Sequence, residues 1–334
     1  MIYKLIINKL KNIKCEEFVF KPLTILTGLN STGKSSVLQS ILLINKETTS
    51  KGVIYFSTIP SSFLSLRNIY ERAKEINIQL ETDAGNITYK LSEDGKIIEG
   101  VTGLRLEENL YYLSANRVGV EVFAEISQDV YCGIDGTYLF GTYEKEKSNP
   151  VCESLIMERS SFTLASQVNY WQSHILGIKL ELSTEKRNEQ TVEIKYKSDG
   201  IPDLLPTQLG TGVSYLVKIL ILCLRAKRGD VIMIENPEVH LHPAAQSRLG
   251  EFFVFIAKAG IQLILETHCE HLINKVQYEV FKKRFKADDT VIYYKKGIAE
   301  PFIEIPLKEN GQFKIDFPEG FFDAALPELL EMDW

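Results

Sequence analysis

One short stretch near the N-terminus constrains the fold of this chain more than any other feature. Residues 28–35 read Gly-Leu-Asn-Ser-Thr-Gly-Lys-Ser and match the phosphate-binding pattern G-x4-G-K-[S/T] without a mismatch. The apolar run 23–27 precedes this stretch, and apolar residues at helical spacing follow it over 35–45. A strand, a glycine loop and a helix in this order are the context of a P-loop, so the sequence predicts one here.

Each part of such a loop helps to hold phosphate. Backbone N–H groups of the glycine loop and of the helix N-terminus would face the phosphates. Lys34 would bring a positive charge to the β and γ groups, and the hydroxyl of Ser35 would be a ligand of Mg²⁺. The residues that we assign to nucleotide binding in the loop are Gly28, Asn30, Ser31, Thr32, Gly33, Lys34, Ser35 and Ser36.

A P-loop needs a second carboxylate for its metal ion, at the end of a neighbouring buried strand. Residues 231–234 are apolar, and Glu235 follows them directly. This pattern is typical of a Walker B motif, and we expect Glu235 to hold Mg²⁺ directly or through a water molecule. The alternative is a strand-end acid that only caps the turn after it.

The periodicity of the chain changes twice. After residue 207, apolar strands alternate with amphipathic helices, which predicts a largely parallel sheet covered on both faces. Residues 53–113 contain short alternating runs with hairpin signals at 83–86 and 93–96, and residues 118–206 are mixed.

We therefore expect an α/β fold of the P-loop NTPase type, with a mixed, mostly parallel sheet flanked by helices. Its head would comprise residues 1–50 and 207–334, and an inserted antiparallel-β and helical lid region would comprise residues 51–206. The predicted helices are 35–45, 164–174, 213–226, 244–259 and 271–282, and the predicted strands are 2–7, 18–20, 23–27, 192–196, 231–234, 261–265 and 290–294.

Two further segments point to a family. Residues 236–243 read Asn-Pro-Glu-Val-His-Leu-His-Pro, and residues 266–271 read Glu-Thr-His-Cys-Glu-His after an apolar run. Together they resemble the ATP-binding-cassette (ABC) ATPases of the SMC, RecF and OLD type. The resemblance implies ATP and Mg²⁺ as cofactors. It also implies that His268 is the switch histidine that contacts the γ-phosphate, and that residues 239–242 form the loop that crosses to a partner subunit.

The segment before the predicted Walker B strand fits the same resemblance. Residues 209–214 read Leu-Gly-Thr-Gly-Val-Ser, open a predicted helix and stand where the cassette signature lies. A glycine-rich helix start offers N–H groups to an anion. The resemblance thus implies a homodimer that closes head to head, with ATP between one P-loop and the signature of the other copy. The signature residues assigned to nucleotide binding are Gly210, Thr211, Gly212 and Ser214.

Residues 112–119, 168–171 and 316–323 narrow the resemblance to bacterial AAA-labelled ATPases that carry a DUF3696 C-terminal segment. This implies an ATP-binding and ATP-hydrolysing switch that regulates a separately encoded effector, a nuclease or a toxin, in a prokaryotic phage-defence system. Two other hypotheses stay open. One is a RecF-like DNA-binding repair ATPase, for which nucleic acid is a possible partner, and the other is a slow or non-hydrolysing nucleotide-dependent scaffold.

Several residues depart from the cassette pattern or fit it loosely. Asn236 stands where a glutamate usually positions the attacking water, and an amide cannot accept the proton of that water. Either Glu238 is the general base or hydrolysis is slow, and we favour slow hydrolysis. Arg117 is assigned to a phosphate or lid contact, with a surface ion pair as the alternative. The catalytic set is then Glu235, Asn236, Glu238 and His268.

Composition excludes several other classes of protein. The 334 residues carry a net charge of −6, so the chain as a whole is not a polycation that coats nucleic acid or an anionic membrane. The five cysteines are scattered without C-x2-C spacing, which argues against a disulfide framework or a zinc cage. No apolar run approaches the roughly 18 residues that span a bilayer, and we expect a soluble, cytoplasmic protein without membrane contact.

Overall fold

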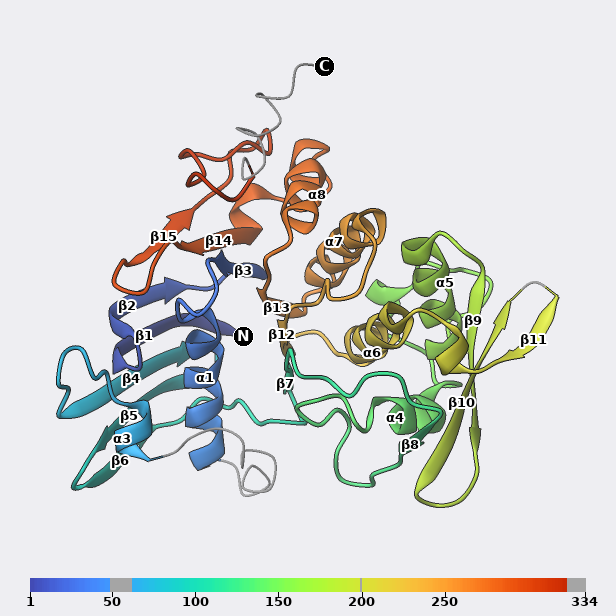
Figure 1. The fold of residues 1–334 in the computed structure, drawn as a ribbon, viewed down its shortest axis with the longest axis horizontal. Coiled ribbons are helices and arrows are strands. Elements are labelled where there is room, and N and C mark those ends of the chain that lie inside the picture. The colour runs from blue at the N-terminus through green and yellow to red at the C-terminus, as the bar shows by residue number, and fades with distance from the viewer. Residues whose placement is uncertain (49–61, 199, 323–334) are drawn as a thin grey trace.

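A six-stranded sheet lies at the centre of the computed structural model, which describes residues 1–48, 62–198 and 200–322 (Figure 1). The strands lie in the order β15-β14-β3-β13-β12-β7, and the five from β14 to β7 are parallel. Only β15 at one edge is antiparallel. The strands are β3 (Leu23–Gly28), β7 (Leu110–Leu113), β12 (Val231–Glu235), β13 (Gln262–Glu266), β14 (Thr290–Lys295) and β15 (Phe302–Ile305).

Alternate residues of the central strands face two separate cores. Val231 and Met233 of β12 pack into one core, whereas Ile232 and Ile234 pack into the other. A strand that is buried on both faces needs a continuous apolar run, and β3, β12, β13 and β14 are buried along their whole lengths. The expected parallel sheet with two covered faces is therefore confirmed.

An antiparallel sheet and helix α1 (Lys34–Thr48) form the first core. The sheet has the order β2-β1-β4-β5-β6. Thr82 pairs with Gly85 and Ser92 pairs with Gly95, so two-residue turns join β4 to β5 and β5 to β6. The hairpin signals in the sequence predicted both turns. Its elements are β1 (Ile2–Leu10), β2 (Ile13–Val19), β4 (Glu75–Thr82), β5 (Gly85–Ser92) and β6 (Gly95–Gly100), with the short helix α3 (Phe63–Leu66) beside them.

Helices cover the other face of the central sheet and carry a third, small sheet on their far side (Figure 1). The helices are α4 (Leu139–Glu146), α5 (Leu164–Leu176), α6 (Thr211–Arg225), α7 (Pro243–Lys258) and α8 (Glu270–Phe281). In the small sheet β10 pairs with β8, β9 and β11. Its strands are β8 (Phe123–Glu125), β9 (Leu180–Lys186), β10 (Thr191–Ser198) and β11 (Ile201–Leu204).

Short 3-10 helices, at Glu153–Leu155, Pro206–Gln208 and Ala287–Asp289, complete the regular structure. The ends of α5 show why a helix forms there: the Thr163 hydroxyl accepts the Ser166 N–H, and Gly177 closes the helix with a left-handed φ of 72°. In the described part of the chain, every helix is too short or too polar to cross a bilayer.

Both the central sheet and the antiparallel sheet of β1 contain strands from residues 51–206, the region predicted to be an insert. β4, β5 and β6 continue the sheet of β1, and β7 is the edge strand beside β12. β7 has only four residues, and all of them are buried. The sequence pattern therefore does not distinguish β7 from the hairpin strands before it. The division into residues 1–50 with 207–334 and 51–206 stays a prediction. Residues 49–50 and 323–334 of the first set and residues 51–61 and 199 of the second lie outside the described residues.

One side chain ties the antiparallel sheet to the central sheet. Gln262 is the first residue of β13 and is almost fully buried. Its Oε1 accepts the Ile2 N–H at 2.7 Å, and its Nε2 donates to the Ile2 carbonyl at 2.8 Å. Both backbone groups at the start of β1 are therefore satisfied by a residue 260 positions away.

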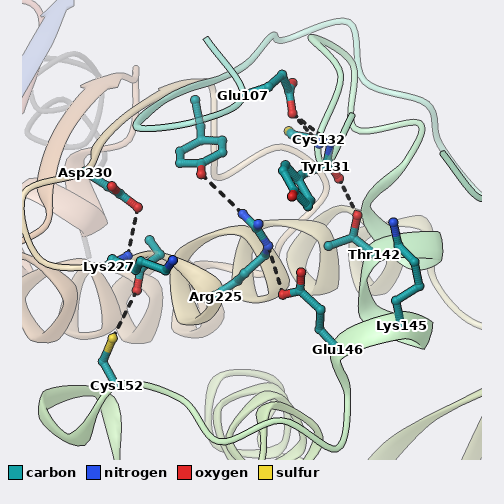
Figure 2. Close-up of polar contacts among 12 residues, drawn as sticks. Glu107, Tyr131, Cys132, Thr142, Lys145, Glu146, Cys152, Arg225, Lys227 and Asp230 are labelled. Carbon is teal, nitrogen blue, oxygen red and sulfur yellow. Dashed lines mark hydrogen bonds and ion pairs between the residues drawn. The ribbon is translucent and has the colours of Figure 1, made fainter. Parts of the chain in front are cut away.

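A polar cluster, buried at Glu107 and Tyr111 and half-buried at its other members, joins the helical region to β7, and we call it the Arg225 cluster (Figure 2). Its members are Glu107, Tyr111, Tyr131, Glu146 and Arg225. The Arg225 guanidinium donates to Glu146 at 3.0 Å and to the Tyr111 hydroxyl at 3.3 Å, and it lies 3.9 Å from the centre of the Tyr131 ring. Glu107 accepts the backbone N–H groups of Tyr131, Cys132 and Gly133 at 2.8–2.9 Å.

Candidate functional site

The predicted P-loop lies between β3 and α1, as the sequence pattern requires. Gly28 has a φ of +130°, and a Cβ at this position would meet the Lys295 carbonyl oxygen at 2.2 Å. Gly33 has a φ of +109°, and its missing Cβ leaves room for the Asn12 side chain. Only glycine fits these two positions, so the G-x4-G spacing follows from the close approach of neighbouring chain segments.

Lys34 folds back into the loop that it follows. Its side chain is 3% exposed, and its Nζ donates to the carbonyls of Gly28 at 3.1 Å and Leu29 at 2.6 Å. Burial lowers the pKa of Lys34, and the nearby Glu266 carboxylate opposes this change. The ammonium group thus lies at the centre of the loop, next to the first turn of α1, where helix N–H groups attract an anion.

Two glutamates end neighbouring strands on the α1 face of the sheet. Glu235 of β12 and Glu266 of β13 are register partners in a parallel pair, so their side chains lie on the same face. Glu266 accepts a hydrogen bond from the Ser35 hydroxyl at 2.9 Å. Burial and then repulsion from Glu235 raise the pKa of Glu266, while Ser35 and Lys34 act in the opposite direction.

Glu235 is held by the protein through both of its carboxylate oxygens. The Tyr112 hydroxyl donates to Oε1 at 2.8 Å, and the Ala115 N–H donates to Oε2 at 3.1 Å. Burial and the Glu235 charge raise the pKa of Tyr112, so this hydroxyl keeps its proton as a donor. Glu235 lies at the predicted strand end, and its assignment to Mg²⁺ stays a prediction.

Arg117 lies beside the end of β12 and is 4% exposed. Its Nη2 donates to the carbonyl oxygens of Glu235 and Asn236 at 2.6 and 2.5 Å. Its guanidinium carbon lies 5.5 Å from the centre of the Tyr215 ring. Burial lowers the pKa of Arg117 to about 10, so it remains charged at neutral pH. The surface ion pair considered for Arg117 is therefore wrong, since the residue is buried.

Asn236, Glu238 and His268 meet where β12 and β13 end. Asn236 has a left-handed φ of 42°, which asparagine tolerates better than most residues, and its N–H donates to the Glu266 carbonyl. Glu238 accepts the His268 N–H at 3.0 Å. Burial and then the Lys34 charge lower the pKa of His268. The structure thus brings the predicted catalytic residues Glu235, Asn236, Glu238 and His268 to one edge of the sheet.

The predicted signature segment opens α6. Gly210 is the N-cap residue of α6, and Gly210 and Thr211 are exposed. Gly212 packs against the His240 carbonyl, and a Cβ on Gly212 would lie 2.3 Å from that oxygen. Ser214 is buried. The exposed members of the predicted set are therefore the two residues at the very start of the helix.

Two hollows flank the P-loop. The larger, of about 650 Å³, is lined by Gly28, Asn30, Glu238, His268 and the tail residues Phe321 and Phe322, among others. The smaller, of about 410 Å³, lies on the other side of the loop. It is lined by Ser31, Gly33, Ser35 and Ser36 together with Lys11, Asn12, Ile69 and Tyr70. Both volumes are within the range of ordinary small-molecule pockets.

The residues present fit Mg²⁺ held together with a nucleotide. In the described ranges, no group of three or more His, Cys, Asp or Glu side chains forms a ready-made metal cage. Mg²⁺ in nucleotide sites does not need one, because phosphates and water supply most of its ligands. Ser35 and Glu266 offer hard oxygen donors beside the P-loop, and Glu266 Oε2 is buried without a hydrogen-bond partner among the described residues.

Sequence reasoning missed Glu266 and Tyr112 as site residues. The signal for Glu266 was present, since residues 262–266 repeat the pattern of 231–235, an apolar strand that ends in a glutamate. Nothing in the sequence marks Tyr112 as the partner of Glu235, because their contact depends on β7 lying beside β12. Phe321 and Phe322 were likewise unforeseen in the lining of the larger hollow.

Comparisons with known proteins bear on this geometry. Residues 146–273 match the sequence model of a family described as the AAA ATPase domain. No match was found among curated proteins.

Solved structures of SMC heads have a similar fold. The SMC head bound to the C-terminal winged-helix domain of ScpA gives a TM-score of 0.59 at 12% identity, covering 92% of this chain and 98% of that one. The Smc head domain with an extended coiled coil, bound to the C-terminal domain of ScpA derived from Pyrococcus furiosus, gives 0.56 at 12% identity, covering 99% of this chain and 98% of that one. The chain therefore has a P-loop ATPase fold of the SMC head type, with a mixed sheet flanked by helices.

Proposed function

We propose that this chain is an ATP-dependent switch whose two copies close head to head around Mg-ATP and regulate a separate effector subunit. The observation that carries the proposal is the arrangement at one edge of the central sheet. There the P-loop lies between two hollows. Gly28, Asn30 and His268 line the larger hollow, whereas Gly33 and Ser35, whose hydroxyl donates to Glu266, line the smaller one. The AAA ATPase domain match and the SMC head fold support a nucleotide-dependent ATPase.

Each residue of this edge has a defined task in the proposal. The loop N–H groups and Lys34 bind the β and γ phosphates, and His268 contacts the γ-phosphate. Mg²⁺ would neutralise phosphate charge and be held at Ser35, with Glu235 as the sequence-derived carboxylate. Tyr70 and Ile69 are exposed beside the smaller hollow, where they offer an apolar surface for the base.

The exposed start of α6 supports the dimeric part of the proposal. Gly210 and Thr211 lie exposed at the N-terminus of α6, where helix N–H groups lack a partner within the helix. In a head-to-head dimer they would receive the γ-phosphate held by the other copy. Gly212 would then act by letting α6 pack against the loop of residues 239–242, and Ser214 is buried.

Slow or partner-dependent hydrolysis fits the residues around the γ-phosphate position. Asn236 can orient a water molecule but cannot accept its proton. Glu238 is the candidate base, and its Oε2 has no hydrogen-bond partner in the described part of the chain, while its Oε1 is occupied by the His268 N–H. Asn236 specifically favours the second candidate function, a nucleotide-dependent scaffold that clamps ATP without rapid turnover.

The effector and the biological setting rest on the family resemblance. The resemblance to the DUF3696 ATPases is a prediction, and with it the phage-defence role and a nuclease or toxin as partner. SMC heads of similar fold were solved bound to domains of ScpA. Binding of a separate polypeptide by this chain, in the cytoplasm, is part of the same proposal.

Phosphate release from ATP by the purified chain tests the proposal. We expect slow turnover in the presence of Mg²⁺ that Lys34→Ala abolishes. Asn236→Glu restores a carboxylate beside the γ-phosphate and should raise turnover, although the left-handed φ at this position costs a glutamate about 1 kcal/mol. Normal turnover in Lys34→Ala would mean that the nucleotide site is wrongly placed.

A further inference from the structure

We propose that Glu266, rather than Glu235, is the carboxylate that works with Ser35 at the Mg²⁺ position of this chain. The inference rests on the proposed function, because it names a residue of the same nucleotide site. It reassigns the role that the sequence pattern gave to the end of β12.

The strand order is the first argument. β13 lies between β3 and β12 in the central sheet. The P-loop leaves the end of β3, so Glu266 is one strand away from it and Glu235 is two strands away. Neighbouring strands are about 4.8 Å apart, and the carboxylate nearer to the loop is therefore the one on β13.

The contact with Ser35 is the second argument. The Ser35 hydroxyl donates to Glu266 Oε1 at 2.9 Å. Ser35 begins the first turn of α1, directly after Lys34, and is the P-loop residue whose hydroxyl is expected at the metal. A carboxylate that accepts this hydrogen bond fixes the hydroxyl oxygen, and the bond does not use the lone pairs of that oxygen, which a metal ion would need.

The unused oxygen of Glu266 is the third argument. Glu266 is 6% exposed, and its Oε2 is one of the buried side-chain oxygens without a hydrogen-bond partner in the described ranges. Leaving a buried carboxylate oxygen unpaired is costly, and such atoms call for a ligand or water. Lys34 is the cation that faces this carboxylate, and it is itself bonded to the loop carbonyls.

Glu235 lacks these properties. Both of its oxygens accept hydrogen bonds, from the Tyr112 hydroxyl and the Ala115 N–H. Arg117 binds the backbone carbonyl of the same residue. These contacts hold the end of β12 against the segment after β7, so Glu235 positions the turn of Asn236 and Glu238.

The test compares the dependence of nucleotide binding on Mg²⁺ in two matched variants, Glu266→Gln and Glu235→Gln. Both remove one charge at register-paired positions and keep the side-chain size. The readout is the affinity for a fluorescent non-hydrolysable ATP analogue with Mg²⁺, divided by its affinity without Mg²⁺. We call this quotient the coupling ratio, and it does not depend on turnover.

We expect Glu266→Gln to lower the coupling ratio at least tenfold, the size usual for a lost partner of a metal ligand. Binding without Mg²⁺ should be unchanged or tighter, since a negative charge near the phosphates is gone. Glu235→Gln should change the coupling ratio less than threefold. Ser35→Ala should lower it as Glu266→Gln does, and the double variant should lose little more, because the two residues act as a unit.

An equal or larger loss of coupling in Glu235→Gln than in Glu266→Gln would overturn the inference while leaving the proposed function intact. Failure of the wild-type chain to bind the analogue would instead refute the proposed function, and this inference with it. Circular dichroism checks that each variant folds. Should Glu266→Gln fail to fold, Glu266→Asp keeps the charge but withdraws it from Ser35, and the same drop in coupling is expected.

Discussion

Two polar clusters of this molecule differ in how completely their atoms are paired by hydrogen bonds or ion pairs. In the Arg225 cluster, the charged groups of Glu107, Glu146 and Arg225 all have protein partners (Figure 2). At the candidate nucleotide site, buried oxygens of Asn236, Glu238 and Glu266 have none within the described residues.

The difference fits a structural role for the Arg225 cluster and a ligand-binding role for the candidate site. Burying an unpaired polar atom costs about 1–3 kcal/mol, so a fold keeps such atoms where a ligand or water completes them. The Arg225 cluster needs no further partner in order to hold the helical region against β7. The candidate nucleotide site has acceptors without a protein partner, which is the property expected of a binding site. The following predictions test this contrast.

The largest expected effect is on the Arg225 cluster. Glu107→Ala removes the acceptor of three backbone N–H groups, so we expect the free energy of unfolding to fall by about 3–5 kcal/mol. Urea denaturation followed by tryptophan fluorescence measures this change. ATP affinity of the folded fraction should stay as in the wild type. A loss below about 1 kcal/mol would show that water replaces the carboxylate and that the cluster is not structural.

Lys34→Ala should show the opposite pattern. It removes the charge expected at the phosphates, and a charge-assisted contact of about 2–3 kcal/mol corresponds to a roughly 100-fold weaker binding of ATP. The free energy of unfolding should stay within about 1 kcal/mol of the wild type, because Lys34 bonds only to loop carbonyls that can bind water. Fluorescence titration with a labelled nucleotide, beside urea denaturation, tests both parts of this expectation.

Tyr112→Phe sharpens the comparison inside the site itself. The variant removes one hydrogen bond to Glu235, and we expect a loss of about 1 kcal/mol in the free energy of unfolding. Affinity for Mg-ATP should hardly change if Glu235 belongs to the paired, structural kind of residue. A tenfold loss of Mg-ATP affinity with unchanged stability would place Glu235 among the ligand-binding residues instead.

The pH dependence of stability gives the smallest effect. Burial raises the pKa of Glu107, while the three N–H groups and Arg225 oppose this change. When the pKa of a carboxyl group is higher in the folded than in the unfolded state, its contribution to stability is fully present below the unfolded pKa of about 4.3. That contribution falls as the pH rises through the folded pKa. The stability advantage of the wild type over Glu107→Gln should therefore narrow from pH 4 toward neutrality. An advantage that widened with pH would contradict the direction of the shift.

Much of the ATPase fold could be predicted from sequence because its strongest signals are local. The glycine spacing of the P-loop, the apolar strands after residue 207 and the two-residue hairpin turns each depend on residues a few positions apart. The helix at 164–174 was also predicted, and the structure extends it only to Leu176.

The roles that could not be predicted from sequence are those that depend on which strands lie side by side. The assignment of Glu235 came from its resemblance to a motif, whereas the contact of Ser35 with Glu266 joins residues 231 positions apart. In the same way, Glu107 gives no sign in the sequence that it will accept three N–H groups from residues 131–133. Strand order and long-range pairing, rather than residue type, decide these roles.

The tie between Gln262 and Ile2 has a consequence for how the chain is made. β3 lies between β13 and β14, so the central sheet cannot close around the P-loop strand until nearly the whole chain has been synthesised. At about 5–20 residues per second, residues 260 positions apart leave the ribosome about 13–50 s apart. During that interval, the apolar faces of β1 and β3 lack their final partners. Newly made chains should therefore depend on chaperones, and truncations near the C-terminus should aggregate rather than fold as shorter heads.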